Sequence, residues 1–125
     1  MDYFYGYVAA SMLLLTLLAL NVSRLRVKLK IGNGDGNNVD MRKAIRAHMN
    51  HLEHALPFGL IVLALAQIGS PASLLAVLVV GFLAARLVHA YGMLTAQFRF
   101  RQLSAGVTYL FEVVGCLAIA MKLMN

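Results

Sequence analysis

The sequence predicts an all-α membrane protein in which four transmembrane helices form one bundle. The first observation behind this fold class is composition: 61% of the 125 residues are hydrophobic, only 13% are charged, and the mean hydropathy is +0.76. A soluble domain of this length has too little interior to bury so many apolar side chains. The second observation is that these side chains fall into four stretches, each near the roughly 20 residues that cross a bilayer. A soluble domain, a disordered chain and a disulfide-stapled scaffold are thereby excluded.

The first two stretches differ in where their polar residues lie. Residues 3–22 carry no charge and begin with Tyr3, Tyr5 and Tyr7, the kind of aromatic group found at a membrane interface. Because no basic leader precedes this stretch, we do not expect it to be a cleavable signal peptide. The second stretch, residues 41–68, is polar in its first half and apolar in its second, so only part of it is expected to lie deep in the membrane.

The last two stretches are apolar with isolated ionisable residues. Residues 71–93 are interrupted only by Arg86 and His89, and residues 103–124 contain Glu112 and end near a lysine. Ala, Leu and Met dominate all four stretches, which favours helices over the alternating strands of a β-barrel.

The basic residues predict how the chain crosses the membrane. All of the 11 Lys and Arg side chains except Arg86 and Lys122 lie in or beside the connections at residues 31–38 and 95–102. The corner between these connections, a Gly-Ser-Pro turn, has no charge. With four spans, both basic connections lie on one side, and the positive-inside rule makes that side cytoplasmic. We therefore expect residues 1–125 to form one domain with both termini outside the cytoplasm.

The net charge of +6 is compatible with nucleic acid, anionic lipid or an acidic ligand as a partner. Nucleic acid needs a solvated basic face, which so apolar a chain can hardly build, so we expect no nucleic-acid partner. Cys116 is the only cysteine, which excludes an internal disulfide, and we expect it to be a small packed side chain. His48, His51 and His54 spread over about 120° of a helix, so at most neighbouring pairs share an ion, and we expect no metal site.

Several polar residues lie in segments that are expected to cross the membrane, where burying a polar side chain costs free energy. Arg46, Asn50 and Glu53 follow i, i+4, i+7 spacing and share one stripe of the second helix. One interpretation is structural: Glu53 pairs with Arg46 or Arg86, and Asn50 joins helices. The other is a basic, partly buried cavity that receives an anionic small molecule. The excess of arginine over nearby carboxylate favours the cavity, because guanidinium groups bind carboxylates in a bidentate fashion.

These residues also carry a family resemblance. The run from Arg46 to Pro57, RAHMNHLEHALP, resembles the second-helix signature of the membrane-associated proteins in eicosanoid and glutathione metabolism (MAPEG), which include the microsomal glutathione transferases. Its pattern is an Arg, an Asn four residues on, a Glu three further and then a Pro. The run from Arg86 to Gly92 resembles the third-helix motif. Arg24-Leu-Arg26 is similar to the basic end of the family's first helix, and QFRFR through Tyr109 to the start of its fourth.

The resemblance covers essentially the whole chain and implies a homotrimer, with glutathione bound as co-substrate between neighbouring subunits near the cytoplasmic face. The residues that it implies for binding glutathione are Arg24, Arg46, Asn50, Glu53, His89 and Tyr109. It implies that Arg99 or Arg101 lies near the sulfur, where a guanidinium favours the reactive thiolate. The choice between these two stays open, because the spacing before Tyr109 needs a gap.

The function implied is an integral membrane glutathione transferase, or peroxidase, that detoxifies lipophilic electrophiles reaching it through the lipid bilayer. The short GDG loop resembles the prokaryotic branch, so we expect a bacterial inner membrane. Met93 stands where eicosanoid-synthesising relatives have a tyrosine, which favours a general transferase. The alternative is a non-enzymatic trimeric membrane scaffold or binding protein whose polar residues only fix packing. A transporter is less favoured, because the chain has no duplicated half.

Overall fold

The computed structural model describes residues 1–124, which form four long helices. These are α1 (Asp2–Leu29), α2 (Val39–Gln67), α3 (Ala72–Leu94) and α4 (Phe98–Leu123). Each is long and apolar enough to cross a membrane, and the described residues contain no strand. The predicted all-α fold with four membrane-spanning helices is therefore confirmed.

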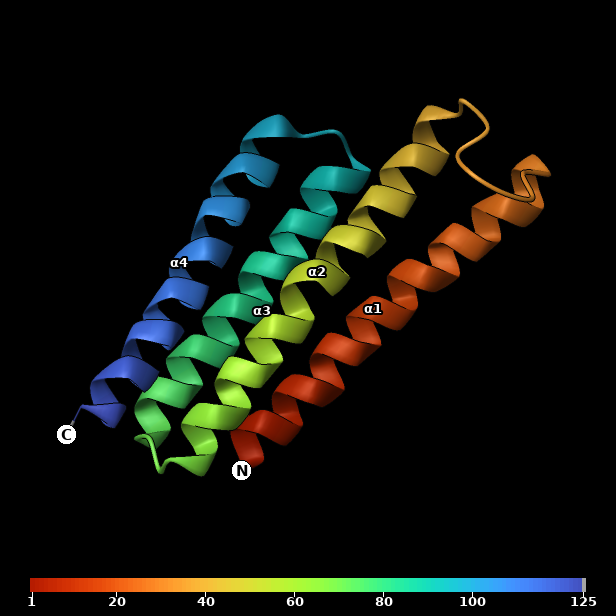
Figure 1. The fold of residues 1–125 in the computed structure, drawn as a ribbon. Coiled ribbons are helices and arrows are strands. Elements are labelled where there is room, and N and C mark those ends of the chain that lie inside the picture. The colour runs from red at the N-terminus through yellow and green to blue at the C-terminus, as the bar shows by residue number, and fades with distance from the viewer. Residues whose placement is uncertain (125) are drawn as a thin grey trace.

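The helices lie side by side and run alternately up and down (Figure 1). The connections α1–α2 and α3–α4 share one end of the bundle, which we call the loop end. Both termini and the α2–α3 connection share the other, the terminal end (Figure 1). The two basic connections thus lie on one side, as the charge pattern predicts.

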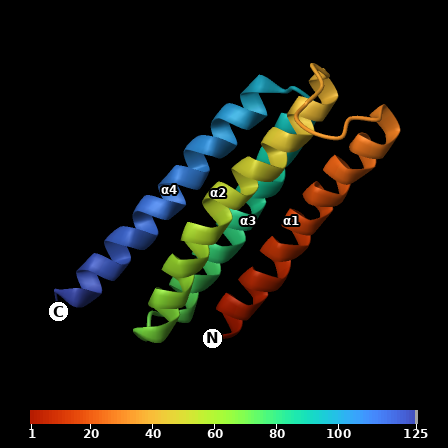
Figure 2. The same ribbon diagram turned by 45° about the vertical axis from the view of Figure 1, so that its right-hand side comes forward.

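The bundle is built around a central pair of helices. α2 and α3 contact each other, and both α1 and α4 contact each of them. Within the described residues α1 and α4 do not contact one another, and Figure 2 shows them on opposite sides of the central pair. Side chains near the middle of α2 and α3 are therefore the ones best placed to be enclosed.

Two helices extend beyond the apolar stretches that predict them. α1 continues to Leu29, and α4 begins at Phe98, so the α3–α4 connection is shorter than the expected 95–102. Arg99 and Arg101 consequently lie in the first turn of α4, and the prediction that they precede the helix is wrong. Hydropathy marks only the apolar part of a span, whereas Arg, Lys, Leu and Gln are good helix formers that continue a helix past it.

The Gly-rich connection after α1 is a compact turn, as expected from its composition. Lys30 ends α1 in the left-handed conformation, with φ of 55°. The Arg26 guanidinium donates to the carbonyl of Gly34 at 3.2 Å, and Arg42 Nε donates to Asp35 Oδ2 at 2.6 Å. The Arg42 side chain holds the pKa of the Asp35 carboxyl below its usual value. Arginines from both flanking helices therefore brace this loop.

An aromatic and aliphatic core fills the half of the bundle near the terminal end. Its buried members, which we call the terminal core, are Tyr7, Phe58, Val62, Leu65, Leu75, Leu78, Val79 and Phe82. The rings of Phe58 and Phe82 stack in parallel planes with centroids 3.7 Å apart. The Tyr7 hydroxyl donates to the carbonyl of Ala55, so the buried phenol has a partner. This core joins α1, α2 and α3.

Candidate functional site

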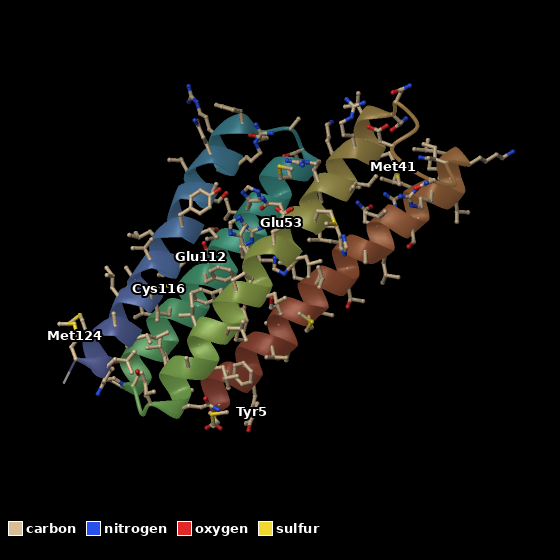
Figure 3. All side chains as sticks on the ribbon, viewed as in Figure 1. Tyr5, Met41, Glu53, Glu112, Cys116 and Met124 are labelled. Carbon is tan, nitrogen blue, oxygen red and sulfur yellow. The ribbon has the colours of Figure 1, made fainter. Side chains whose placement is uncertain are left out.

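Buried polar side chains take the place of the aromatic core in the middle and loop-end half of the bundle. Those buried are Ser11, His51, Arg86, His89, Ser104 and Thr108. Arg86 is only 1% exposed and is the largest fully buried side chain described. Figure 3 shows Glu53 and Glu112 midway along the bundle, Met41 near the loop end and Tyr5 near the terminal end.

The Arg86 guanidinium joins three helices through neutral partners. Its Nη2 donates to Asn50 Oδ1 at 2.7 Å, and it makes longer contacts of 3.5 Å with His51 Nδ1 and Thr108 Oγ1. Among the described residues no carboxylate forms an ion pair with it. The interpretation in which Glu53 pairs with Arg46 or Arg86 is therefore wrong, whereas Asn50 does join two helices through its bond to Arg86. Glu53 is exposed, whereas Arg86 is buried.

Two histidines of α2 contact different neighbouring helices. His51 Nε2 lies 3.1 Å from the carbonyl of Ser11 on α1, whereas His54 Nδ1 lies 2.8 Å from Glu112 Oε1 on α4. The ring of Tyr109 lies 5.3 Å from that of His54. In the part of the chain that the structure describes, no three His, Cys, Asp or Glu side chains gather as metal ligands. These histidines therefore link helices.

An open cavity of about 560 Å³ lies at the loop end between α2, α3 and α4. We call it the loop-end cavity, and its volume is in the range of about 300–1,000 Å³ usual for small-molecule sites. The predicted site residues that line it are Arg46, Asn50, His89, Arg101 and Tyr109. The structure thus brings together residues from three helices that the sequence spreads over more than 60 positions.

The loop-end cavity carries uncompensated positive charge. Arg42, Lys43, Arg46 and Arg101 line it, and no carboxylate does. Arg42 and Lys43 each pair with an aspartate, at 2.6 and 3.4 Å. Arg46 and Arg101 form no ion pair with any described residue. Two guanidinium groups are therefore available to an anion, and each can bind a carboxylate with two parallel hydrogen bonds.

Contacts from α3 hold Arg101 in place. His89 Nδ1 donates to the Arg101 carbonyl at 3.2 Å and also lies 3.2 Å from Ser104 Oγ. At Gly92 the backbones approach so closely that an added Cβ would lie 2.7 Å from the backbone nitrogen of Arg101. The first turn of α4 has no acidic residue, and cations there oppose the helix dipole. The position of these arginines is therefore not explained by the stability of the helix.

Some predicted site residues lie outside the loop-end cavity. Arg24 donates to Asn21 Oδ1 at 2.9 Å and lines a second cavity, of about 330 Å³, between the ends of α1 and α2. Glu53 and Arg99 are exposed and line neither cavity. Cys116 is exposed on α4 (Figure 3), so the expectation that it is packed is wrong. Its apolar neighbours Val113 and Leu117 on α4 are also exposed.

Sequence reasoning missed three residues of the site. Arg42 and Lys43 lie four and three positions before Arg46, so extending the polar stripe of the second helix by one turn would have found them. Gly92 belongs to the third-helix motif, but its role depends on the packing of α3 against α4. No pattern within one helix indicates such an approach.

The fold and the cavity define a four-helix membrane protein with a cationic cavity at its loop end. The MAPEG family model matches residues 4–121, so the chain belongs to the MAPEG family, and the resemblance seen in the helix motifs is confirmed. The inner membrane protein YecN of Escherichia coli strain K12 is 29% identical over 120 residues, which cover 95% of this chain and 86% of YecN. YecN of Escherichia coli O6:H1 strain CFT073 matches with the same identity and coverage. No solved structure matches the chain.

Proposed function

We propose that this protein is an integral membrane glutathione transferase, which joins the glutathione thiolate to lipophilic electrophiles. The observation that carries the proposal is the loop-end cavity, where Arg46 and Arg101 have no ion pair among the described residues and no carboxylate lines the wall. Membership of the MAPEG family supports glutathione as the ligand. A cavity of this charge suits a small anion better than a neutral or cationic one.

Glutathione complements the groups on the wall of the cavity. It carries two carboxylates for guanidinium groups such as Arg46, and its peptide groups have partners in the neutral side chains of Asn50, His89 and Tyr109. Its free thiol has a pKa of about 8.5, so an adjacent cation is needed to favour the thiolate at neutral pH. We assign this role to Arg101 rather than Arg99, because Arg101 lines the cavity and Arg99 does not.

The remaining predicted residues support a homotrimer. Arg24 and Glu53 lie outside the loop-end cavity of their own protomer, so they reach the ligand only if a neighbouring subunit brings them to it. In that arrangement Glu53 pairs with the ammonium of glutathione. Chemical cross-linking of the protein in native membranes is expected to give bands up to the trimer and none beyond it.

The reaction follows from the thiolate and the membrane. The sulfur attacks an electrophilic carbon, a carbon–sulfur bond forms, and the leaving group departs with its electron pair. The electrophile, dissolved in the bilayer, enters laterally past apolar wall residues such as Met93 and Phe98. With an organic hydroperoxide the same thiolate acts as a reductant: two glutathione molecules yield the disulfide, an alcohol and water.

We place the protein in a bacterial inner membrane with the loop end in the cytoplasm and both termini outside. The basic residues around the α1–α2 and α3–α4 connections support this orientation. YecN, the relative in Escherichia coli, is named as an inner membrane protein, which supports the location.

A glutathione titration of the detergent-solubilised protein tests the proposal. Wild-type protein is expected to develop the ultraviolet absorbance of a bound thiolate. Arg101→Ala is expected to lose that band and about 100-fold in kcat/KM, the scale for removing one preorganised charge-stabilising donor. Arg99→Ala is the matched control, because Arg99 is two residues away and does not line the cavity, and it is expected to stay near wild type. If the wild-type protein binds no glutathione, the proposal is wrong.

The competing explanation is a non-enzymatic scaffold in which the polar residues only fix packing. It predicts that Arg46→Ala disrupts assembly and that glutathione leaves the unfolding temperature unchanged. A ligand that binds only the folded state must raise that temperature. A glutathione-dependent rise in wild type, absent in Arg46→Ala, separates the two explanations.

A further inference from the structure

Asn50 lies between the loop-end cavity and the buried charge of Arg86. It lines the cavity from α2, and its Oδ1 accepts a hydrogen bond of 2.7 Å from Arg86 Nη2 on α3. Arg86 itself is 1% exposed and does not line the cavity. Its influence on a ligand there must therefore pass through a neighbour, and the shortest hydrogen bond that it makes leads to Asn50.

The direction of this hydrogen bond determines how the amide of Asn50 is oriented. A guanidinium only donates, so the partner that faces it has to be the amide oxygen. The amide nitrogen is then directed away from Arg86. It has no hydrogen-bond partner among the described residues, and it is not among their buried unpartnered atoms. Its N–H groups are consequently open to a ligand in the cavity that Asn50 lines.

We propose that Arg86 is a positioning residue, which holds the Asn50 amide so that the cavity presents an N–H donor to an acceptor oxygen of its ligand. The inference rests on the proposed function, in which that oxygen belongs to glutathione. Without Arg86 the amide can turn over and present its oxygen, which is unfavourable for an anionic ligand. The arrangement also explains a costly feature, because a buried guanidinium without a carboxylate partner is expensive within a membrane.

A double-mutant cycle measures whether Arg86 acts through Asn50. Glutathione binding is measured by calorimetry on the full-length protein in detergent for wild type, Arg86→Met, Asn50→Ala and the double variant. Each single substitution is expected to weaken binding about tenfold, the size of one hydrogen bond to a charged group. The double variant is expected to bind no more weakly than Asn50→Ala. Losses that multiply to about 100-fold would mean that Arg86 acts independently, through its charge or the fold, and would overturn the inference.

Thr108→Val is the matched control for a merely structural role. It removes another contact of Arg86, at 3.5 Å, without touching Asn50. Glutathione affinity is expected to change less than about twofold, the scale of a non-contacting substitution. A loss as large as that of Arg86→Met would assign the effect to packing and contradict the inference.

Arg86→Lys keeps the experiment informative if Arg86→Met does not fold. The lysine retains a donor for the oxygen of Asn50, so binding within about threefold of wild type is expected, whereas the loss of the hydrogen bond costs about tenfold. Affinity as low as in Asn50→Ala would overturn the inference. Failure of the proposed function gives a different result, because the wild-type protein then binds no glutathione at all, and the inference falls with it.

Discussion

The terminal and loop-end halves of the bundle hold their helices together by different means. Near the terminal end, rings such as those of Phe58 and Phe82 fill the interior with stacked apolar surface. Towards the loop end, Arg86 links α2, α3 and α4 through hydrogen bonds, and a cavity opens between these helices. The comparison teaches that this small protein separates close packing from an open cationic cavity along its axis.

The separation has a physical reason. Helix association inside a bilayer gains little from the hydrophobic effect and depends on close packing and interhelical hydrogen bonds. A cavity forfeits close packing locally. The terminal core provides the close packing that the loop end lacks, so a chain of 125 residues can tolerate a polar, open loop end. Substitutions in one half should accordingly change stability, and substitutions in the other should change binding.

The largest expected effect is on stability, in the terminal core. Phe82→Ala removes one member of the stacked pair and leaves a void that the neighbouring helices cannot fill. Truncation of a buried Phe costs about 3–5 kcal/mol in soluble proteins, and we expect about 3 kcal/mol here. Reversible unfolding in mixed micelles measures it. The Phe82→Ala protein that remains folded is expected to bind glutathione as tightly as wild type. A selective loss of binding would show that the two halves do not act separately.

The next effect lies at the boundary between the halves, where His54 and Glu112 form a hydrogen-bonded pair across α2 and α4 at 2.8 Å. His54→Leu leaves the Glu112 carboxyl without this partner in an apolar layer. We expect a loss of about 1.5 kcal/mol, near the upper end for an interhelical hydrogen bond in a membrane. The same unfolding measurement applies. If Glu112→Gln, which can still hydrogen-bond, is as unstable as His54→Leu, the pair does not act as a hydrogen bond.

A smaller effect is expected at the close approach of α3 and α4, and it should appear in binding. Gly92→Ala places a methyl group against the backbone of Arg101 and pushes the first turn of α4 away from the cavity. Glutathione affinity is expected to fall about tenfold, which corresponds to about 1.4 kcal/mol. Gly106→Ala is the matched control, since nothing lies within 4 Å of an added Cβ there. Equal losses in both variants would show that the approach is unimportant.

The smallest effect is expected in the α1–α2 loop. The pKa of Asp35 is lowered by Arg42, so any stabilisation by the carboxylate is complete above its unfolded pKa of about 3.9 and is lost as the pH falls through the lower folded value. Because this pair is exposed, Asp35→Asn is expected to leave the unfolding temperature unchanged between about pH 5 and 8. A clear decrease of the unfolding temperature at neutral pH would mean that Asp35 stabilises the protein more than an exposed ion pair can.

The extent to which the sequence predicts the site differs from residue to residue. Arg46 and Asn50 share a stripe of one helix, so helical periodicity alone was enough to group them. Arg101 was recognised only as one of two candidates, because arginines two residues apart on a helix point in different directions and no spacing rule says which one lines the cavity. Glu53 follows the same period as Arg46 and both are exposed, yet only Arg46 lines the loop-end cavity, which no spacing within one helix could indicate.

By itself the sequence determined the membrane class, the four spans, the shared end of the two basic connections and the family motifs. These properties depend on composition and on spacing within single helices, which are local. Only the tertiary structure decided that Arg86 bonds to Asn50, that His54 pairs with Glu112 and that Gly92 admits the start of α4. Each of these depends on the rotation of one helix against another, which is set by side-chain packing between segments far apart in the chain.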